Sequence, residues 1–399
     1  MTVQSEVHRT PQILDRLRLL PALQQPDWQD HPELPGSRSA LADTTPLVDV
    51  DHIRTFRLLL AEVAAGRMQI VQAGDCAEDP AEHTHRHLGR KLDLLEAMAG
   101  VMRRNTGRPV LCVGRIAGQF AKPRSSAIDV VGDLELPSYR GPLVNLPEPT
   151  AEARRPDPAR MLECHASATA MMRLLNSPGV LTPAPLLWTS HEALVLDYEL
   201  PQVRRADDDG LLYLTSTHWP WVGERTRQPD GAHVALMREI ANPVACKVGP
   251  KTTPEQAVEL CGLFDPDREP GRLTLISRMG PAIEKGLPAL VDAVRAAGHP
   301  VIWLCDPMHG NTIPAPSGHK TRLLTSVRAE MTAFQRIVAE HGGIAAGVHL
   351  ETTPDPVTEC SADADRTGEV GNHYTTLCDP RLNPQQALSL VTGWSANPA

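Results

Sequence analysis

The sequence is poor in aromatic residues, has no clustered cysteines and contains no long hydrophobic run. Phenylalanine, tyrosine and tryptophan make up 4% of its 399 residues, so we expect a core built from aliphatic side chains. Its eight cysteines are scattered without CxxC or paired-zinc spacing, which excludes a dense disulfide framework and is typical of a reducing cytoplasm. No apolar run of about 18 residues occurs, and the opening MTVQSEVHRT is polar, so we expect neither a membrane span nor a signal peptide.

An excess of basic charge is also missing. With 39 basic and 48 acidic residues the net charge is −9, which argues against a nucleic-acid-binding surface. Small anionic substrates stay open, because local clusters of lysine and arginine would bind them whatever the net charge. Proline, in contrast, is abundant at 37 residues, so we expect long ordered loops.

The first 66 residues read as a helical segment that precedes the main fold. Residues 11–25 and 51–66 carry the apolar spacing of amphipathic helices, and the second ends in a glycine stop signal. Residues 31–48 are expected to form a loop between these two helices. We therefore expect an N-terminal helical extension over residues 1–66 and a catalytic domain over residues 67–399.

After this extension, short β-rich runs alternate with helical stretches. The expected strands lie within residues 67–74, 108–115, 210–218, 242–250, 272–280, 299–307, 343–351 and 374–380. The expected crossover helices lie within residues 82–105, 253–264, 283–298 and 325–342. Alternation of this kind predicts parallel βαβ units, and eight units favour an α/β fold of the (β/α)₈ TIM-barrel type over a doubly wound sheet. The proline-rich residues 132–160 are too many for a plain connection and predict a loop insertion after the second strand.

Four residues of metal-ligand type follow the expected strand ends, at the edge of a barrel where catalytic groups gather. They are Cys76, His309, Glu351 and Asp379. Singly, each has an ordinary explanation, as a core residue or a solvated strand end. Together, a thiolate, an imidazole and two carboxylates suit Mn²⁺, Fe²⁺, Co²⁺ or Zn²⁺, and metal binding would keep the cysteine ionised.

A cationic group is expected at the same mouth. It comprises Arg115, Arg225, Lys247 and Arg278, with Glu224 beside them. Surface salt bridges would explain these residues one at a time. Several cations beside a divalent metal repel one another unless an anion joins them, so the pattern points to a small substrate that carries phosphate and carboxylate.

Two further basic stretches are weaker signals. The turn AKPRSS places Lys122, Arg124 and Ser125 where they could hold another phosphate, although a plain basic loop explains them equally well. Lys320 and Arg322, in PSGHKTR, are ambiguous in the same way.

Two other patterns favour structural explanations. Residues 189–194, TSHEAL, mimic a capping box and read as a helix start. His83, His85 and His87 alternate along an expected helix, and this spacing favours a solvated or subunit-facing surface over a metal site.

Several ordered motifs resemble one enzyme family, the type II 3-deoxy-D-arabino-heptulosonate 7-phosphate (DAHP) synthases. The motifs are QAGDCAE, GRIAGQFAKPRS, SHEALVLDYE, WVGERTRQPDGAHV, NPVACKVGP, LTLISRMG, VIWLCDPMHGNT and CDPRLNPQQ, and the resemblance runs from about residue 10 to 390. It implies a metal-dependent TIM barrel that condenses phosphoenolpyruvate (PEP) with erythrose 4-phosphate and water, releasing phosphate in the first step of the shikimate pathway. Mn²⁺ is the expected ion.

The resemblance also implies roles for single residues. The family's metal ligands fall on Cys76, His309, Glu351 and Asp379, and its PEP contacts on Arg115, Glu224, Arg225, Lys247 and Arg278. The motifs that match erythrose 4-phosphate contacts hold Lys122, Arg124, Ser125 and Lys320. Lys122 is the expected proton donor, and either Glu224 or a metal-linked water is expected to deliver the water.

The chain departs from the family pattern in its short length and in HLETTPDPVTEC, which has less glycine than is usual after the glutamate. Short forms of this kind resemble those of bacterial secondary-metabolite clusters, such as phenazine biosynthesis, so we expect weak or absent feedback inhibition by Trp, Phe or Tyr. A homodimer or higher homo-oligomer is expected, with a chorismate mutase as a further partner. Two alternatives stay open: the same chemistry on another aldose phosphate or amino-tetrose, and a non-catalytic barrel that serves another shikimate-pathway enzyme.

Overall fold

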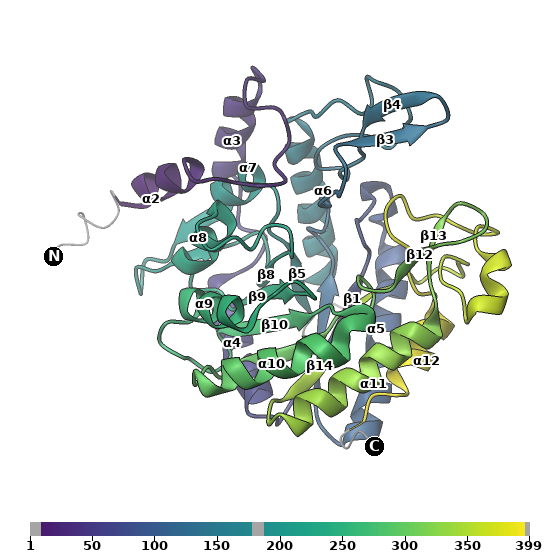
Figure 1. Ribbon diagram of the computed structural model, residues 1–399. Coiled ribbons are helices and arrows are strands. Elements are labelled where there is room, and N and C mark those ends of the chain that lie inside the picture. Colours follow the sequence, from purple (N-terminus) through teal and green to yellow (C-terminus); the bar gives the residue numbers. More distant parts are fainter. Residues whose placement is uncertain (1–8, 178–186, 396–399) are drawn as a thin grey trace.

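The computed structural model describes residues 9–177 and 187–395, and its centre is a closed barrel of eight parallel strands (Figure 1). The barrel strands are β1 (Gln69–Gly74), β2 (Val110–Arg115), β5 (Trp188–Glu192), β8 (Trp219–Val222), β9 (Val244–Val248), β10 (Leu273–Ser277), β11 (Ile302–Cys305) and β14 (Ala345–Glu351). They follow one another around the barrel in chain order, and β14 closes it against β1. The expected TIM barrel is confirmed, and the doubly wound sheet is wrong because the first and last strands pair with each other.

Six of the eight expected strands are barrel strands, and two are wrong. Within residues 210–218, β7 (Leu212–Leu214) pairs antiparallel with β6 (Val203–Arg205) in a separate small sheet, and the barrel strand β8 starts just after it. Residues 374–380 form no strand. There the buried carboxylate of Glu359 accepts the backbone N–H groups of Thr375 and Thr376, so a side chain replaces a neighbouring strand.

Two barrel strands were not predicted, β8 and β5, and β5 occupies the segment read from its sequence as a helix start. Its five residues, WTSHE, are mostly polar, yet Trp188, Thr189, Ser190 and His191 are buried. Because the polar side chains form hydrogen bonds in the protein interior, no apolar run marks this strand in the sequence.

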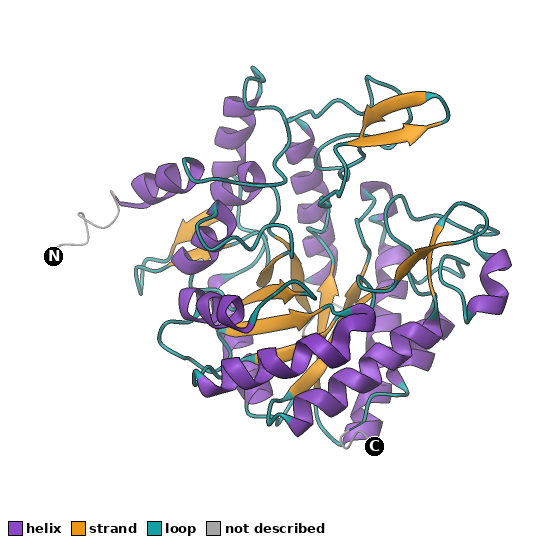
Figure 2. Ribbon diagram, viewed as in Figure 1, coloured by secondary structure: helices purple, strands orange, loops and turns teal. Residues whose placement is uncertain are grey.

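The helices surround the strands (Figure 2). The expected crossover helices are confirmed as α5 (His85–Thr106), α9 (Pro254–Phe264), α10 (Ile283–Ala296) and α11 (Leu324–Glu340). The others after the second strand are α6 (Arg160–Leu175), the short α7 (Leu196–Glu199), α8 (Ala232–Glu239) and α12 (Pro384–Val391). In α10, Ile283, Leu287, Leu290 and Val294 are buried at helical spacing, which explains why it lies with one face on the barrel.

Three helices precede the barrel among residues 9–68: α2 (Arg9–Arg18), α3 (Leu34–Ala42) and α4 (Val50–Ala64). The loop expected over residues 31–48 is wrong, because α3 lies within it. Its prolines mislead, since Pro35 stands in the first turn of α3, where a missing N–H costs nothing, and Leu34 and Leu41 are buried on one face.

Helix α4 lies against the barrel at the end where the strands begin. Its side chains Phe56, Leu60 and Val63 are fully buried and join a cluster with first residues of the strands, such as Ile70 and Trp188. The expected domain boundary at residue 66 stays a prediction, and residues 1–8 of the extension lie outside the described residues.

The insertion expected after the second strand is present between β2 and β5. It contains a hairpin of β3 (Ile128–Val131) and β4 (Leu134–Pro137), which stands apart from the barrel at the upper right of Figure 1. A second hairpin, β12 (Thr312–Pro314) with β13 (Lys320–Arg322), follows β11. Across residues 9–177 and 187–395, no helix combines the length and apolar character that a membrane crossing needs.

Candidate active site

A cavity of about 380 Å³ opens where the barrel strands end. All thirteen residues singled out as site residues from the sequence line this cavity: Cys76, Arg115, Lys122, Arg124, Ser125, Glu224, Arg225, Lys247, Arg278, His309, Lys320, Glu351 and Asp379. The segments that carry them are separated by up to about 300 residues in the chain, and closure of the barrel brings them together.

Three of the four metal-type residues converge at the junction of the first and last strands. One donor atom each of Cys76, Glu351 and Asp379 lies within 4.8 Å of the other two. Gly74 pairs with Glu351 on one side and with Arg115 on the other, so these strand ends stand side by side. Gly74 has a φ of +148°, and a Cβ there would lie 2.8 Å from the carbonyl oxygen of Arg115, so this junction requires glycine.

Asp379 reaches the same point from a loop, rather than from the strand end that the sequence predicted. Its backbone N–H donates to the Cys76 Sγ at 3.4 Å, which fixes the loop beside the first strand. The loop is held from behind by Arg381, which contacts Glu359 and Asp75.

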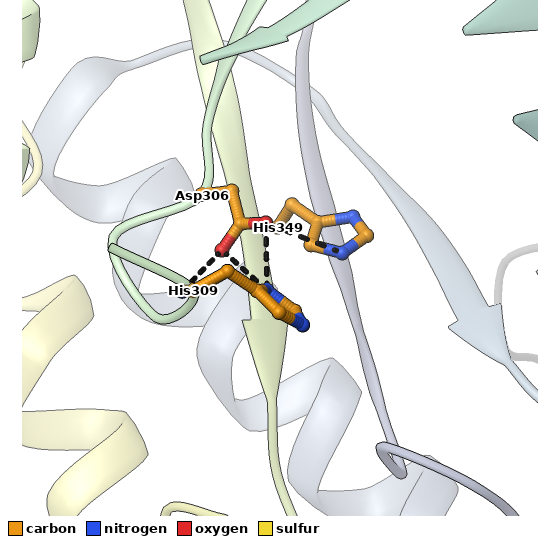
Figure 3. Close-up of side chains that lie close together, drawn as sticks. All are labelled: Asp306, His309 and His349. Atoms are coloured by element: carbon orange, nitrogen blue, oxygen red, sulfur yellow. Dashed lines mark hydrogen bonds and ion pairs between the residues drawn. The ribbon is translucent and has the colours of Figure 1, made fainter. Parts of the chain in front are cut away.

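His309 completes the set, and Asp306 orients it (Figure 3). The His309 Nε2 lies 3.1 Å from Glu351 Oε1, while its Nδ1 lies 2.8 Å from Asp306 Oδ2. A carboxylate that holds one nitrogen of a histidine while the other faces a metal is a recurrent arrangement in metal sites. Asp306 was missed in the sequence, although it stands three residues before His309 in CDPMHGNT.

Asp306, His309 and His349 also lie close enough together to suggest a second metal site (Figure 3). In this group the ammonium of Lys247 donates to Asp306 Oδ2 at 2.8 Å. Both ring nitrogens of His349 are engaged by Arg115 and Gln72. His349 therefore has no free ring nitrogen to offer a metal ion in this arrangement.

The donor set of Cys76, His309, Glu351 and Asp379 fits a divalent cation by its chemistry. Although burial raises the pKa of both carboxyl groups, their cationic neighbours outweigh it and hold the pKa values of Glu351 and Asp379 well below the usual range, so both are ionised. The Lys122 ammonium already contacts Cys76 Sγ and Asp379 and lies 3.7 Å from Glu351 Oε1. Positive charge is thus held where a metal ion's charge would be. Burial raises the pKa of the Cys76 thiol, and a bound cation would reverse this.

Lysine and arginine dominate the remainder of the cavity. Among the described residues, seven lysines and arginines line it, namely Arg115, Lys122, Arg124, Arg225, Lys247, Arg278 and Lys320, against the four carboxylates of Glu192, Glu224, Glu351 and Asp379. Arg115 and Lys247 are buried, at 2% and 6% exposed, and burial lowers the pKa of Lys247. A local excess of cations in a protein of net charge −9 is the property expected of a site for doubly anionic substrates.

The outer part of the cavity is more exposed. The Arg225 Nη2 donates to the Ser125 Oγ at 2.6 Å, and Lys320 contacts Asp379 at 2.9 Å. Arg124 is paired with Asp129 of the insertion. This rim therefore joins the inserted segment to the barrel proper.

Besides Asp306, sequence reasoning missed one charged residue of the site, Glu192, and left another, Arg322, ambiguous. Glu192, at the end of β5, lines the cavity, its Oε1 is buried without a hydrogen-bond partner among the described residues, and burial raises its pKa. The fully buried Arg322, left ambiguous in the sequence, lies 2.7 Å from Glu351 Oε2. Glu192 ends a strand that was not recognised, so only the motif SHEAL could have indicated it.

The expected solvated histidine face is wrong for one of its three members. The ring of His83 is 3% exposed, with Nε2 lying 3.3 Å from Glu78 Oε2. His85 is exposed, and His87 lies 3.2 Å from Glu82.

The fold and the site define a barrel enzyme with a metal-type donor set and a cation-lined cavity for anionic substrates. Residues 12–180 and 180–393 match the model of the class-II DAHP synthetase family, and the chain belongs to this family. The reaction of this family is the condensation of PEP with erythrose 4-phosphate and water to DAHP and phosphate, which begins the shikimate pathway. Members of the family are divalent-metal enzymes.

Two curated relatives, 53% and 40% identical to this chain, agree. A protein of Pseudomonas fluorescens described as a probable phospho-2-dehydro-3-deoxyheptonate aldolase is 53% identical over 392 residues, covering 97% of this chain and 98% of the relative. The phospho-2-dehydro-3-deoxyheptonate aldolase of Mycolicibacterium smegmatis is 40% identical, covering 95% of this chain and 93% of the relative. A solved DAHP synthase structure from Thermotoga maritima superposes with a TM-score of 0.37 and 14% identity, over 82% of this chain and 68% of that chain.

Proposed function

We propose that Cys76, His309, Glu351 and Asp379 together bind the divalent ion of this enzyme, with Mn²⁺ as the natural ion and Co²⁺, Fe²⁺ or Zn²⁺ as alternatives. The observation that carries this proposal is the convergence of Cys76, Glu351 and Asp379 at one point of the cavity, with His309 Nε2 3.1 Å from Glu351 Oε1. When bound, the ion supplies Lewis-acid polarisation of the aldehyde of erythrose 4-phosphate. Arg322 and Asp306 contact two of the ligands from outside and hold them in place.

We further propose that PEP binds among Arg115, Glu224, Arg225, Lys247 and Arg278. The two buried cations, Arg115 and Lys247, and Arg278 next to the His309 backbone present donors from three strand ends. Arginine forks match carboxylate and phosphate oxygens, and burial strengthens these interactions. Glu224 is paired with Arg227 at 2.9 Å, so its charge is balanced by a residue outside this set.

Erythrose 4-phosphate is proposed to bind through Arg124, Ser125 and Lys320 at the rim and through Lys122, which lies deeper in the cavity beside Cys76. These side chains line the cavity on the side of Asp379 and the insertion. A phosphate held there would leave the aldehyde end free to approach the metal-type donors and the PEP-binding cations. Binding both substrates in one orientation replaces an improbable encounter in solution.

Lys122 and Glu224 are the proposed catalytic residues. Burial lowers the pKa of Lys122, but the neighbouring carboxylates of Asp379 and Glu351 outweigh this effect and hold the pKa well above its usual value, so Lys122 is protonated. It can therefore give a proton to the hydroxyl oxygen that forms when C3 of PEP attacks the aldehyde. Glu224 is proposed to orient the water that adds at C2, and Glu192, which also lines the cavity, is a second candidate for this role.

Protein partners, cellular location and secondary metabolism stay predictions based on the family resemblance. They are a homodimer or higher homo-oligomer, a chorismate mutase partner, a cytoplasmic location and a link to secondary metabolism. A panel of aldehydes tests the substrate. If the natural substrate is another aldose phosphate or an amino-tetrose, the enzyme turns it over faster than erythrose 4-phosphate.

The ligand assignment is tested on purified variants, with Mn²⁺ binding measured by calorimetry and activity measured as turnover. Cys76→Ala is expected to lose tight Mn²⁺ binding and metal-dependent activity, because it removes one of four donors. Cys261→Ala, which alters a buried thiol on α9, is the matched control and should retain both. Undiminished binding and activity in Cys76→Ala would remove the basis of the metal-site proposal.

A further inference from the structure

A ring of hydrogen bonds lies inside the barrel beneath the cavity and includes Arg115. The Arg115 Nη1 lies 2.8 Å from His349 Nε2, and His349 Nδ1 lies 2.6 Å from Gln72 Oε1. The amide of Gln72 donates to the Ser190 Oγ at 2.9 Å, and Ser190 donates to the carbonyl oxygen of Gly114 at 3.3 Å. The ring thus starts at the end of β2, passes through β14, β1 and β5, and returns to β2.

The donors and acceptors of this ring can be assigned in only one direction. A guanidinium can only donate, so His349 Nε2 must be the acceptor and its proton must lie on Nδ1. That N–H needs an acceptor, and the amide oxygen of Gln72 supplies it. The amide nitrogen then donates to Ser190, whose hydroxyl donates its own proton to the backbone.

His349 and Gln72 lie below the cavity rather than in its lining, and both are fully buried. His349 Nε2 lies 4.0 Å from Asp306 Oδ2, beyond hydrogen-bond distance, so Arg115 is its partner. Trp221 packs against both members of the pair, with its ring 5.2 Å from that of His349 and 5.4 Å from the Arg115 guanidinium carbon.

The other nitrogens of the Arg115 guanidinium show what the hydrogen bond to His349 prevents. Its Nη2 lies 3.2 Å from Glu351 Oε1 and 3.3 Å from the Cys76 carbonyl oxygen, while its Nε has no hydrogen-bond partner among the described residues. Without an acceptor at His349, both terminal nitrogens would be free to form a two-point pair with Glu351. Such a pair would turn the guanidinium away from an anion in the cavity and occupy a carboxylate of the metal-type set.

We propose that His349, held in one tautomer by Gln72 and Ser190, is a positioning residue that orients Arg115 for binding of the anionic PEP. The proposal rests on the proposed role of Arg115 in PEP binding. His349 acts through Arg115 and touches no substrate. Its contribution is therefore to PEP affinity, and much less to the affinity for erythrose 4-phosphate.

The test is the dissociation constant of PEP, measured by calorimetry on the Mn²⁺-loaded enzyme, together with KM for each substrate. His349→Leu removes the acceptor, and Gln72→Met removes the group that fixes the tautomer while leaving His349 in place. Each should weaken PEP binding about tenfold, the effect of losing one hydrogen bond to a charged group, with KM for erythrose 4-phosphate changed less than about twofold. His349→Gln should restore most of the affinity, because its amide can accept from Arg115 and donate to Gln72.

Two further variants make the outcome unambiguous. Thr274→Val alters another buried position of the barrel, where the hydroxyl has no hydrogen-bond partner among the described residues, and should leave PEP binding unchanged. Arg115→Leu reports the proposed role of Arg115 itself and should weaken PEP binding. Gln72→Met decides the matter if His349→Leu fails to fold.

Weak PEP binding in Arg115→Leu with wild-type binding in both His349→Leu and Gln72→Met would overturn the inference alone. Wild-type PEP binding in Arg115→Leu would overturn the proposed role of Arg115, and the positioning role of His349 with it. Equal loss of affinity for PEP and erythrose 4-phosphate in Gln72→Met, or no rescue by His349→Gln, would show a general structural role and would also contradict the inference.

Discussion

The acidic residues on either side of Cys76 hold the loops around it. Asp75 pairs with Arg381 at 2.7 Å, which ties the first strand to the loop that carries Asp379. The buried Glu78 accepts three consecutive backbone N–H groups, from residues 117–119, at 2.8–3.0 Å. Residue 117 is an alanine with a φ of +63°, so this carboxylate stabilises an uncommon backbone conformation just before Lys122. The motif GDCAE therefore combines one proposed metal ligand with two residues that anchor loops.

Asp306 provides the clearest prediction for a single residue. Asp306→Asn removes the charge that holds His309 Nδ1 and the Lys247 ammonium, so Mn²⁺ affinity should fall by about tenfold to a hundredfold. Calorimetric titration with Mn²⁺ measures the effect. Asp292→Asn is the matched control, because Asp292 lies 2.8 Å from the Nδ1 of His341 on an exposed surface. Equal Mn²⁺ affinity in the two variants would contradict the assigned role of Asp306.

Between elements, Glu330 of α11 joins the loops that carry Arg278 and the histidine of the metal-type set. Its Oε1 accepts the backbone N–H groups of Met279 and Gly280, both at 2.8 Å, and its Oε2 accepts from the Asn311 side chain at 2.6 Å. The two loops meet backbone to backbone at Gly280 and Gly310, where a Cβ on either residue would overlap the other. A helix outside the barrel thus sets the spacing of two site loops.

This clasp predicts a pH dependence of stability. Burial raises the pKa of Glu330 from an ordinary value of 4.5 to about 7. Between these values the folded protein binds more protons than the unfolded chain, so the contribution of Glu330 to the free energy of unfolding is full below pH 4.5. It is lost as the pH rises through about 7, a loss of about 3 kcal/mol.

Urea unfolding of the wild type and of Glu330→Gln at about pH 5 and about pH 8, on either side of the raised pKa, measures this contribution. The neutral glutamine should lack the part of the pH dependence that Glu330 supplies. Glu340→Gln, on the same helix but exposed, should keep it. The same change in unfolding free energy for the wild type and Glu330→Gln would refute the assignment.

A strand can be predicted from the sequence when its buried side chains are apolar, and not when they are polar and hydrogen-bonded in the interior. Strands with apolar runs, such as residues 244–248, are recognisable, and the cationic or ligand residues at their ends were placed correctly in the cavity. β5 was not recognised, because its polar side chains form hydrogen bonds in the interior and leave no apolar run. Glu192, at the end of this strand, was therefore not predicted as a site residue. Asp379 was placed in the cavity on a wrong premise, since it stands on a loop that Glu359 and Arg381 hold. Long-range contacts of this kind leave no local pattern.

At the scale of the whole molecule, apolar packing and the charged site residues lie at opposite ends of the barrel. Helix α4 packs its apolar face against the end where the strands begin, while charged residues gather at the other end. The net charge of −9 makes the protein acidic as a whole, so the cation-lined cavity is the part of the molecule suited to doubly anionic substrates.

The short chain carries a prediction about regulation. The alignment with the Mycolicibacterium smegmatis relative spans 436 positions, more than the 399 residues of this chain, so the relative has segments that are missing here. We expect activity to change little when Trp, Phe or Tyr is added, singly or together, to a steady-state assay at millimolar concentration. Strong inhibition by any of the three would show that a feedback site exists without those segments.

The central proposal is that a divalent metal bound in this cavity helps to join PEP to erythrose 4-phosphate. Phosphate release from PEP by EDTA-treated protein, measured with erythrose 4-phosphate before and after addition of Mn²⁺, tests this dependence directly. Release that appears only when both Mn²⁺ and erythrose 4-phosphate are present is the predicted result. Release without any metal, or silence with every divalent metal offered, would contradict it.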